Sequence, residues 1–524
     1  MKPFSTLKSK IKTGLGRLRA LFYVGNRDVS RCSVPSAVAK TTCSFGASHR
    51  EAVLSIRQLG VYFPRLYQIM SGIGAILRSF VYGTRYIVGV CAVAFAFWAI
   101  QADTLGLVAM AIIAGIVMLA TRDFLPALLP VVLLGFFIPM QDSPVGDIIM
   151  KNLAIFVLIA LLVIGAIVYV LSAKRLVLGK HFWPYAAMSL SFILAGIGFS
   201  DYNPNTILNL ASVMLSFVFY FCARNGIRSV NKYYLVKVFT AIGILVFAEI
   251  VWYYLMHEDL AYAISAKTLH LRWAISNAAA AVIMITIPIT LYGYILTKKL
   301  GYLGALLIEY VGVVISLSRG CMLIAIVCIP IVMALIFMYS DRKKRLAVLG
   351  IAAVVLLALL MLIVEEIVSS TLARLTSLGF SDSGRLNIYK LAVQDFITNP
   401  IFGVGVRNPR DPYGRIYWYH STPLQFLACG GLIGIASYAF HLFSLGKRLK
   451  KRLLNPFNLC VAFAMVHWGL YGFMDNNFFM SVQAFLFAAL IIVHEKNAER
   501  ESVSNQSMAL KAPHQKVSAR QSKK

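Results

Sequence analysis

Long hydrophobic runs, each about the length of a membrane-crossing helix, follow one another along most of this chain. Short polar loops separate the runs, and this alternation predicts a bundle of membrane-spanning helices. We count about 14 candidate spans, several of them shorter than the roughly 20 residues that a span prefers. The fold class is therefore predicted to be all-α, a polytopic integral membrane helix bundle. The spans lie near residues 86–101, 104–120, 124–140, 152–171, 182–199, 206–223, 236–256, 275–296, 300–317, 321–339, 346–363, 421–445, 457–474 and 477–493.

Basic and acidic loops alternate along the chain, and this alternation predicts which side of the membrane each loop faces. One set of loops is rich in lysine and arginine, which places it in the cytoplasm, and the other set carries acidic residues. Both termini are then cytoplasmic, and the one large polar loop, residues 364–420, is extracytoplasmic. Basic residues on the predicted outer side are exceptions to this rule and are concentrated at Lys267, Arg272, Arg319 and the large loop.

The two ends of the chain differ in composition from its middle. Residues 1–60 and 496–524 are basic and aperiodic, which predicts disordered cytoplasmic tails. Residues 61–83 have apolar positions at helical spacing with flanking arginines, a pattern that fits an amphipathic interfacial helix or a helix packed on the bundle. Residues 84–495 form the predicted transmembrane domain.

Composition excludes several classes of protein. Hydrophobic residues make up 59% of the chain and charged residues 14%, so a soluble domain could not bury the apolar surface. The net charge of +29 lies mostly in the tails and short loops, without an aromatic RNA-binding signature, so nucleic acid is not an expected partner. The eight cysteines form no CxxC or Cys/His cluster, and we expect neither a metal nor a nucleotide-binding loop.

The large loop gathers arginines ahead of a single histidine. Arg385 begins a segment expected to be helical, and Arg407, Arg410 and Arg415 precede His420 at the start of the next span. Histidine exchanges protons near neutral pH, and arginine binds phosphate or carboxylate through two hydrogen bonds. The loop therefore indicates an anionic substrate at this membrane face, although a histidine at a helix start is also a common structural residue.

Two further arginines lie at predicted span ends. Arg319, in SLSRG, is costly at membrane depth unless it is paired or hydrated, which favours either a functional role or an extension to the interface. Arg272 precedes a span with Asn277 five residues further on, and fits a head-group contact or an interfacial anchor beside Trp273. Supporting candidates are Glu249 and Glu309 within spans, and His467, Asp475, Asn476 and Asn477 near the last hairpin.

Together these residues resemble the motifs of the O-antigen ligase and O-antigen polymerase superfamily of polytopic glycan transferases. The chain departs from that pattern in having Cys429 where an acidic residue is frequent, and in its span count, since about twelve are usual. The resemblance comprises an arginine–asparagine element at Arg272 and Asn277, a serine–arginine–glycine span end at 316–320, Gly384-Arg385 with NPIFGVG at 399–405, and a histidine motif from His420-Ser421 to Gly431 and Gly434.

The resemblance implies a metal-independent, inverting glycosyltransferase that needs no cofactor. Its donor would be a glycan on a polyprenyl diphosphate at the outer face of the cytoplasmic membrane. Its acceptor would be a hydroxyl of a glycan, a lipid or a wall polymer. His420 would be the general base, Arg272 and Arg319 would bind the diphosphate, and the second-rank substrate contacts would be Asn277, Arg385, Arg407 and Arg410.

Two other classes of protein fit the same composition. A multi-span transporter or lipid-linked glycan flippase would show two related halves around a central path. A membrane scaffold would keep Arg272, Arg319 and His420 far apart. Within the transferase class, ligase and polymerase share the residues above, so both stay open.

Overall fold

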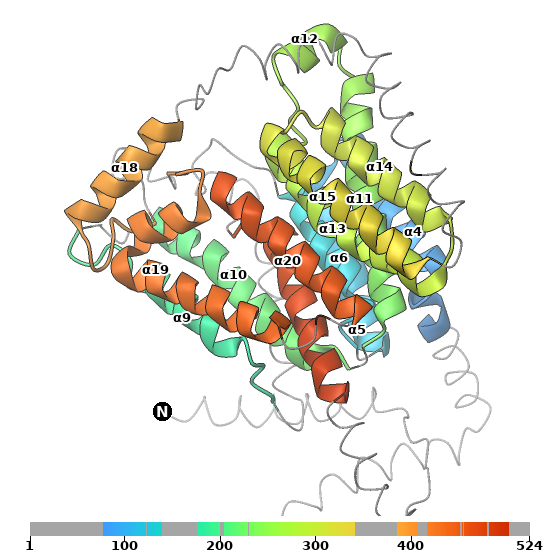
Figure 1. Ribbon diagram of the computed structural model, residues 1–524, viewed down its shortest axis with the longest axis horizontal. Coiled ribbons are helices and arrows are strands. Elements are labelled where there is room, and N and C mark those ends of the chain that lie inside the picture. Colours follow the sequence, from blue (N-terminus) through green and yellow to red (C-terminus); the bar gives the residue numbers. More distant parts are fainter. Residues whose placement is uncertain are drawn as a thin grey trace, which may run out of the picture. The chain divides into compact units, whose positions relative to one another are not determined.

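A computed structural model gives the structure of the chain (Figure 1). The chain forms two compact units, Met1–Gly83 with Leu119–Arg122, and Thr84–Met118 with Asp123–Lys524. Of the first unit, residues 77–83 and 119–121 are described. The described residues are 77–121, 123–138, 165, 176–199, 204–228, 230–340, 350, 385–406, 417–450, 453, 455–478 and 482–501.

Several predictions lie outside these residues. They concern most of the tails and of residues 61–83, the spans near 152–171 and 346–363, and, in the large loop, Arg407 and Arg410.

The regular elements of the described residues are all helical, and the all-α prediction is confirmed for them. Residues 482–501 form a helix that runs past the predicted end of the transmembrane domain at 495. The others are α4 (Thr84–Ala99), α5 (Asp103–Thr121), α6 (Leu128–Leu133), the 3-10 helix η1 (Leu134–Phe137), α9 (Phe182–Ile193), α10 (Pro204–Gly226), α11 (Lys232–Leu255), α12 (Leu260–Ser265), α13 (Ser276–Thr297), α14 (Gly301–Ile315), α15 (Arg319–Tyr339), α18 (Arg385–Thr398), α19 (Thr422–Leu449) and α20 (Pro456–Met474).

Six of the described helices are long and apolar enough to cross a membrane, which makes this a multi-pass membrane protein. They are α5, α11, α13, α15, α19 and α20; α4, α6 with η1, and α14 are shorter apolar helices. Each of these helices coincides with a predicted span to within a few residues, because an apolar run is a local signal. The total of about 14 spans and their sidedness stay predictions.

Helix α13 forms the core of the second unit. It packs against α11, α14, α15 and α20, and almost all of its side chains are buried. Helix α20 packs on α13 and α15 and also on α19, and α19 packs on α9 and α18 (Figure 1). Helix α20 therefore connects the elements around α13 to those around α19, and the functional site described below lies at its end.

The glycine-containing turn after α18, residues 399–405, fits into a break in α19. Helix α19 is interrupted at Gly431, which has φ 60° and ψ −150°. At this break the Val404 amide donates to the Ala428 carbonyl (2.9 Å), and the Leu432 amide donates to the Pro400 carbonyl (2.8 Å). The turn thus uses the backbone groups that the break leaves unpaired, and it holds α18 against α19.

Two glycines are required for this close approach of the backbone. Gly403 and Gly431 both have positive φ, where a side chain is strained. A Cβ atom at Gly431 would also lie 2.5 Å from the Ile401 carbonyl, and one at Gly403 would collide with the Cys429 carbonyl. Gly403 of the NPIFGVG segment and Gly431 of α19 are therefore both needed for the same close packing of the two backbones.

Candidate functional site

The ends of α13, α15, α19 and α20 meet around one imidazole. His420 lies two residues before α19, Asp475 directly follows α20, Asn277 is in the first turn of α13, and Ser318 precedes α15. With Arg385, the first residue of α18, these residues make up what we call the His420 cluster. Hydrogen bonds thus join residues that are up to 198 positions apart in the sequence.

His420 and Asp475 form a hydrogen-bonded pair. The distance between His420 Nδ1 and Asp475 Oδ1 is 3.1 Å, and the side chains are 34% and 9% exposed. An ionised carboxylate only accepts hydrogen bonds, so Nδ1 carries the proton and Nε2 is left as the acceptor. Nε2 makes no hydrogen bond with the described residues, and the half-exposed ring can therefore meet a substrate hydroxyl.

The surroundings of Asp475 keep its carboxyl ionised. Burial alone would raise its pKa, but the hydrogen bond and charge of His420, the Asn476 amide and the Arg385 guanidinium together lower the pKa below its ordinary value. The Asn476 amide donates to Asp475 Oδ1 at 2.9 Å. At neutral pH the carboxylate is therefore available to orient the imidazole and to stabilise its protonated form.

The backbone of His420 has a strained conformation that neighbouring hydrogen bonds hold in place. Its φ of 47° is left-handed, and the Tyr389 hydroxyl of α18 donates to its carbonyl at 3.3 Å. Thr422, at the start of α19, donates to the Asp475 carbonyl (3.1 Å) and to Asn477 Oδ1 (2.8 Å). The start of α19 is thus fixed to the end of α20. Backbone strain of this kind is typical of functional sites.

Asn277 links α13 to α15 and α20. Its Nδ2 donates to Asp475 Oδ2 (3.3 Å), and its Oδ1 accepts from the Ser318 hydroxyl (2.9 Å) and from Lys267 Nζ (3.1 Å). The sequence indicated Asn277 as a substrate contact, whereas Lys267 stood out only as a basic residue on the predicted outer side. Ser318 was missed, although it belongs to the SLSRG motif.

Arg385 contacts the cluster from α18, and Arg319 follows the cluster residue Ser318 at the start of α15. Arg385 Nη1 donates to the Met474 carbonyl at 2.7 Å, beside Asp475. Arg319 is the half-buried first residue of α15 and follows Ser318. Gly320 brings this helix end against α20, because a Cβ there would lie 2.8 Å from Met474 Sδ.

Arg272 is held away from the cluster by partners on α4 and α5. Its Nη1 lies 3.0 Å from Asp103 Oδ1, and its guanidinium stacks 5.4 Å from the centre of the Trp98 ring and donates to the Trp98 carbonyl. The Arg272 side chain is 26% exposed and that of Asp103 is 30% exposed. The structure therefore brings together His420, Asn277 and Arg385, while Arg272 forms an ion pair with Asp103. Arg319 is next to Ser318 in the chain.

Other predicted supporting residues have partners of different kinds. Glu249 accepts from Trp273 Nε1 (2.8 Å) and Glu309 from the Thr290 hydroxyl (2.8 Å), so neither carboxyl is hydrogen-bonded to an arginine. His467 packs its ring on Phe463 instead of joining the cluster. Of the hairpin candidates, the structure places Asp475 in direct contact with His420.

The starts of α13, α15 and α19 converge on this cluster without side-chain caps. Their N-cap residues are Ile275, Ser318 and Ser421, and none of these side chains bonds the helix end. Uncapped helix N-termini carry partial positive charge and backbone N–H groups that favour anions. The cluster thus combines a proton acceptor with an electropositive setting.

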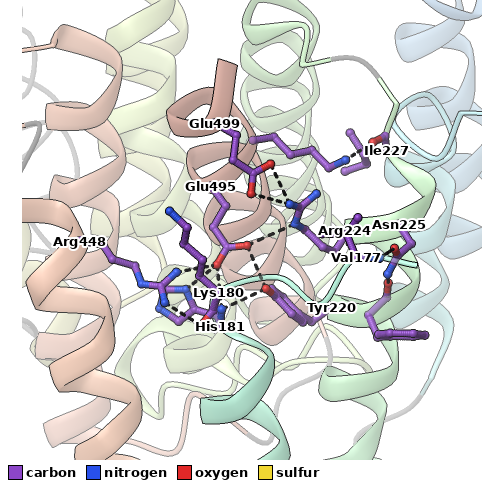
Figure 2. Close-up of polar contacts among 12 residues, drawn as sticks. Val177, Lys180, His181, Tyr220, Arg224, Asn225, Ile227, Arg448, Glu495 and Glu499 are labelled. Atoms are coloured by element: carbon purple, nitrogen blue, oxygen red, sulfur yellow. Dashed lines mark hydrogen bonds and ion pairs between the residues drawn. The ribbon is translucent and has the colours of Figure 1, made fainter. Parts of the chain in front are cut away.

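A second polar cluster surrounds Glu495 near the other end of α19 (Figure 2). Glu495 accepts from His181 Nδ1 (2.9 Å), from the Tyr220 hydroxyl (2.9 Å) and from Arg448 Nη1 (2.9 Å), and lies 3.4 Å from Arg224 Nε. We call these five residues the Glu495 cluster. They come from the segment before α9, from α10, from α19 and from helix 482–501, and so they tie these elements together.

The geometry defines a class: a multi-pass membrane protein with a histidine–carboxylate pair at converging helix ends. Residues 303–439 match the family model described as O-antigen ligase, the family whose motifs the sequence resembles. The family implies glycosyltransferase activity on lipid-linked glycans. Arg319, Arg385 and His420 lie inside the matched residues, and Arg272, Asn277 and Asp475 lie outside them. No curated protein matches the chain.

Proposed function

We propose that this protein transfers an oligo- or polysaccharide from a polyprenyl diphosphate to an acceptor hydroxyl at the outer face of the cytoplasmic membrane, as a ligase or a polymerase of cell-surface polysaccharide. One observation carries the proposal: the His420–Asp475 pair lies at the uncapped starts of α13, α15 and α19, within and beside the O-antigen ligase domain. A base and an anion-binding surface are what this transfer needs.

His420 is the general base of the proposed reaction. Its Nε2 takes the proton from the acceptor hydroxyl while Asp475 holds Nδ1–H and stabilises the imidazolium that forms. The acceptor oxygen forms a bond to the anomeric carbon from the side opposite the diphosphate. The carbon–oxygen bond to the diphosphate breaks, its electron pair leaves with the phosphate oxygen, and the configuration of the anomeric carbon is inverted.

The leaving group gains negative charge as this bond breaks, and the cations of the site offset it. We assign the diphosphate to Arg319 and the helix N-termini, and Arg272 joins them by exchanging Asp103 for a phosphate oxygen. Asn277, Arg385, Arg407 and Arg410 are proposed as further contacts to the substrate. Because protein cations neutralise the leaving group, the proposed reaction requires no metal.

The test is an analysis of lipid-linked glycans in cells that lack this protein and are complemented with variants. With His420→Ala at normal protein level, we expect the polyprenyl-diphosphate donor to accumulate and the transferred product to disappear. Long chains on the lipid would identify a ligase, and single repeat units a polymerase. Near-normal product from His420→Ala would refute the role of His420, and donor retained on the cytoplasmic leaflet would indicate a flippase instead.

A further inference from the structure

Lys267 occupies a constrained position in the connection between α12 and α13. Its φ is 56°, its amide donates to the Ile264 carbonyl (3.2 Å), and the next amide, of Thr268, donates to the Ala263 carbonyl (3.0 Å). The Tyr253 hydroxyl of α11 donates to the Thr268 carbonyl at 2.7 Å. A left-handed backbone is strained for a residue other than glycine, so the surrounding contacts maintain this geometry.

Backbone strain is unevenly distributed over the described residues. Six non-glycine residues there have positive φ, and four of them, Lys267, Arg272, Leu317 and His420, lie in the segments that lead into α13, α15 and α19. Those are the helices whose starts meet at the His420 cluster. Strained backbone conformations cluster at functional sites. Both the backbone conformation of Lys267 and its side-chain contact therefore associate it with the His420 cluster.

The side chain of Lys267 extends to the His420 cluster. Its Nζ donates to Asn277 Oδ1 at 3.1 Å, and the same amide group donates from Nδ2 to Asp475 at 3.3 Å. One amide therefore separates the ammonium from the carboxylate that holds His420. The positive charge lies beside the helix starts to which we assign the diphosphate.

Arg272, five residues further along the same connection, is in a different state. Its charge is matched by Asp103 at 3.0 Å, and its guanidinium is stacked on Trp98. The Trp98 indole also donates to the Leu271 carbonyl at 3.2 Å, which fixes this part of the connection to α4. The side chain of Lys267 contacts the His420 cluster through Asn277, whereas that of Arg272 is paired with Asp103.

We infer that Lys267 is a further phosphate-binding residue of this site, which contacts the diphosphate of the donor. The inference rests on the proposed function. Lys267 then contributes to binding of the donor in the ground state, and its positive charge matters more than its shape. Asn277 is the positioning residue that aims the ammonium.

The experiment measures donor KM, kcat and inhibition by inorganic pyrophosphate with purified protein in proteoliposomes. The variants are Lys267→Met, Lys267→Arg and, as a matched control, Lys298→Met. Lys298 also has positive φ and donates to a backbone carbonyl, that of Tyr339, but it lies at the other end of α13. Melting temperatures of all variants report whether they fold.

We expect Lys267→Met to raise the donor KM and the pyrophosphate inhibition constant about tenfold, the effect of losing one charge-assisted contact of about 1.4 kcal/mol. Lys267→Arg should stay within about threefold of the wild type because it keeps the charge, and Lys298→Met should not change either constant. A fall in kcat alone, with the pyrophosphate inhibition unchanged, would show that Lys267 only supports Asn277 and would overturn the inference.

His420→Ala separates this inference from the proposed function. If His420→Ala is inactive and Lys267→Met leaves both constants unchanged, the inference about Lys267 fails and the transferase proposal stands. If His420→Ala retains transfer, the proposed function itself fails.

Discussion

Two histidine–carboxylate pairs lie toward opposite ends of α19, and their surroundings give them opposite properties. In His181–Glu495 the atoms are 2.9 Å apart and both side chains are 1% exposed, whereas in His420–Asp475 they are 3.1 Å apart and the imidazole is 34% exposed. Glu495 is also contacted by Arg224, Arg448 and Tyr220, which use its remaining acceptor sites (Figure 2). Only the pair with an accessible ring can exchange a proton with a substrate.

The pKa values of His181 and Glu495 also distinguish the buried pair from the accessible one. Burial lowers the pKa of His181, although Glu495 acts against this, so its ring stays neutral. Burial raises the pKa of Glu495, but the hydrogen bond and charge of His181, the Tyr220 hydroxyl and the Arg448 charge lower it overall. The result is a neutral imidazole bound to a carboxylate whose charge two arginines balance. We interpret this cluster as structural and the His420 cluster as catalytic.

Asp475→Asn removes the carboxylate of the proposed catalytic pair while nearly keeping the shape of the side chain. The amide can no longer hold Nδ1–H and stabilise the imidazolium, so kcat should fall about 10²- to 10⁴-fold with little change in donor KM. Steady-state kinetics in proteoliposomes test this, with Glu495→Gln as the matched change in the other pair. A kcat within a few-fold of the wild type would mean that Asp475 does not act through His420.

Glu495→Gln should act on stability and not on chemistry. Removing one partner of a buried ion pair costs about 3–5 kcal/mol because the remaining charges lose their counterion. We expect a clearly lower melting temperature in detergent, together with near-normal transfer per folded molecule. Transfer lost in a protein that melts normally would show that the Glu495 cluster has a catalytic role.

The helices and the residues at their ends could be predicted from the sequence, whereas the contacts between distant residues could not. Apolar runs gave the helices α11, α13, α15 and α20 because periodicity is local, and His420 and Arg319 stood out as polar residues at span ends. The pairing of Arg272 with Asp103 and the assembly of the Glu495 cluster join residues from distant parts of the chain, and no local pattern encodes such contacts. The sequence indicated Lys267 as a basic residue on the predicted outer side. Its hydrogen bond to Asn277 could be identified only from the folded structure.

Acidification should weaken the Glu495 cluster. Glu495 and His181 both have lowered pKa values when folded, so the unfolded chain binds their protons more readily as pH falls. Their stabilisation is therefore full above the unfolded pKa values, about 6.5 for histidine and 4.3 for glutamate, and is lost as pH falls through the folded values. Melting temperatures from pH 8 to pH 4 should decrease, and less steeply in Glu495→Gln; equal slopes would contradict this origin.

Asp103→Asn should have the smallest effect, and in the opposite direction. If Arg272 must exchange Asp103 for the diphosphate, neutralising Asp103 frees the guanidinium, and donor KM should decrease. Partly exposed ion pairs contribute about 0–1 kcal/mol, so the decrease should be at most about fivefold. Kinetics of Asp103→Asn alone and combined with Arg272→Ala check this. A decrease that persists without Arg272 would show a different cause.

The most direct test of the difference between the two histidines compares His420→Ala with His181→Ala. The rate of glycan transfer per folded molecule is measured for both variants side by side in proteoliposomes. The account predicts a loss of about 10²- to 10⁴-fold for His420→Ala at an unchanged melting temperature. For His181→Ala it predicts a lower melting temperature with near-normal transfer by the folded fraction. Comparable losses of transfer in both variants, or a His420→Ala protein that still transfers glycan normally, would contradict it.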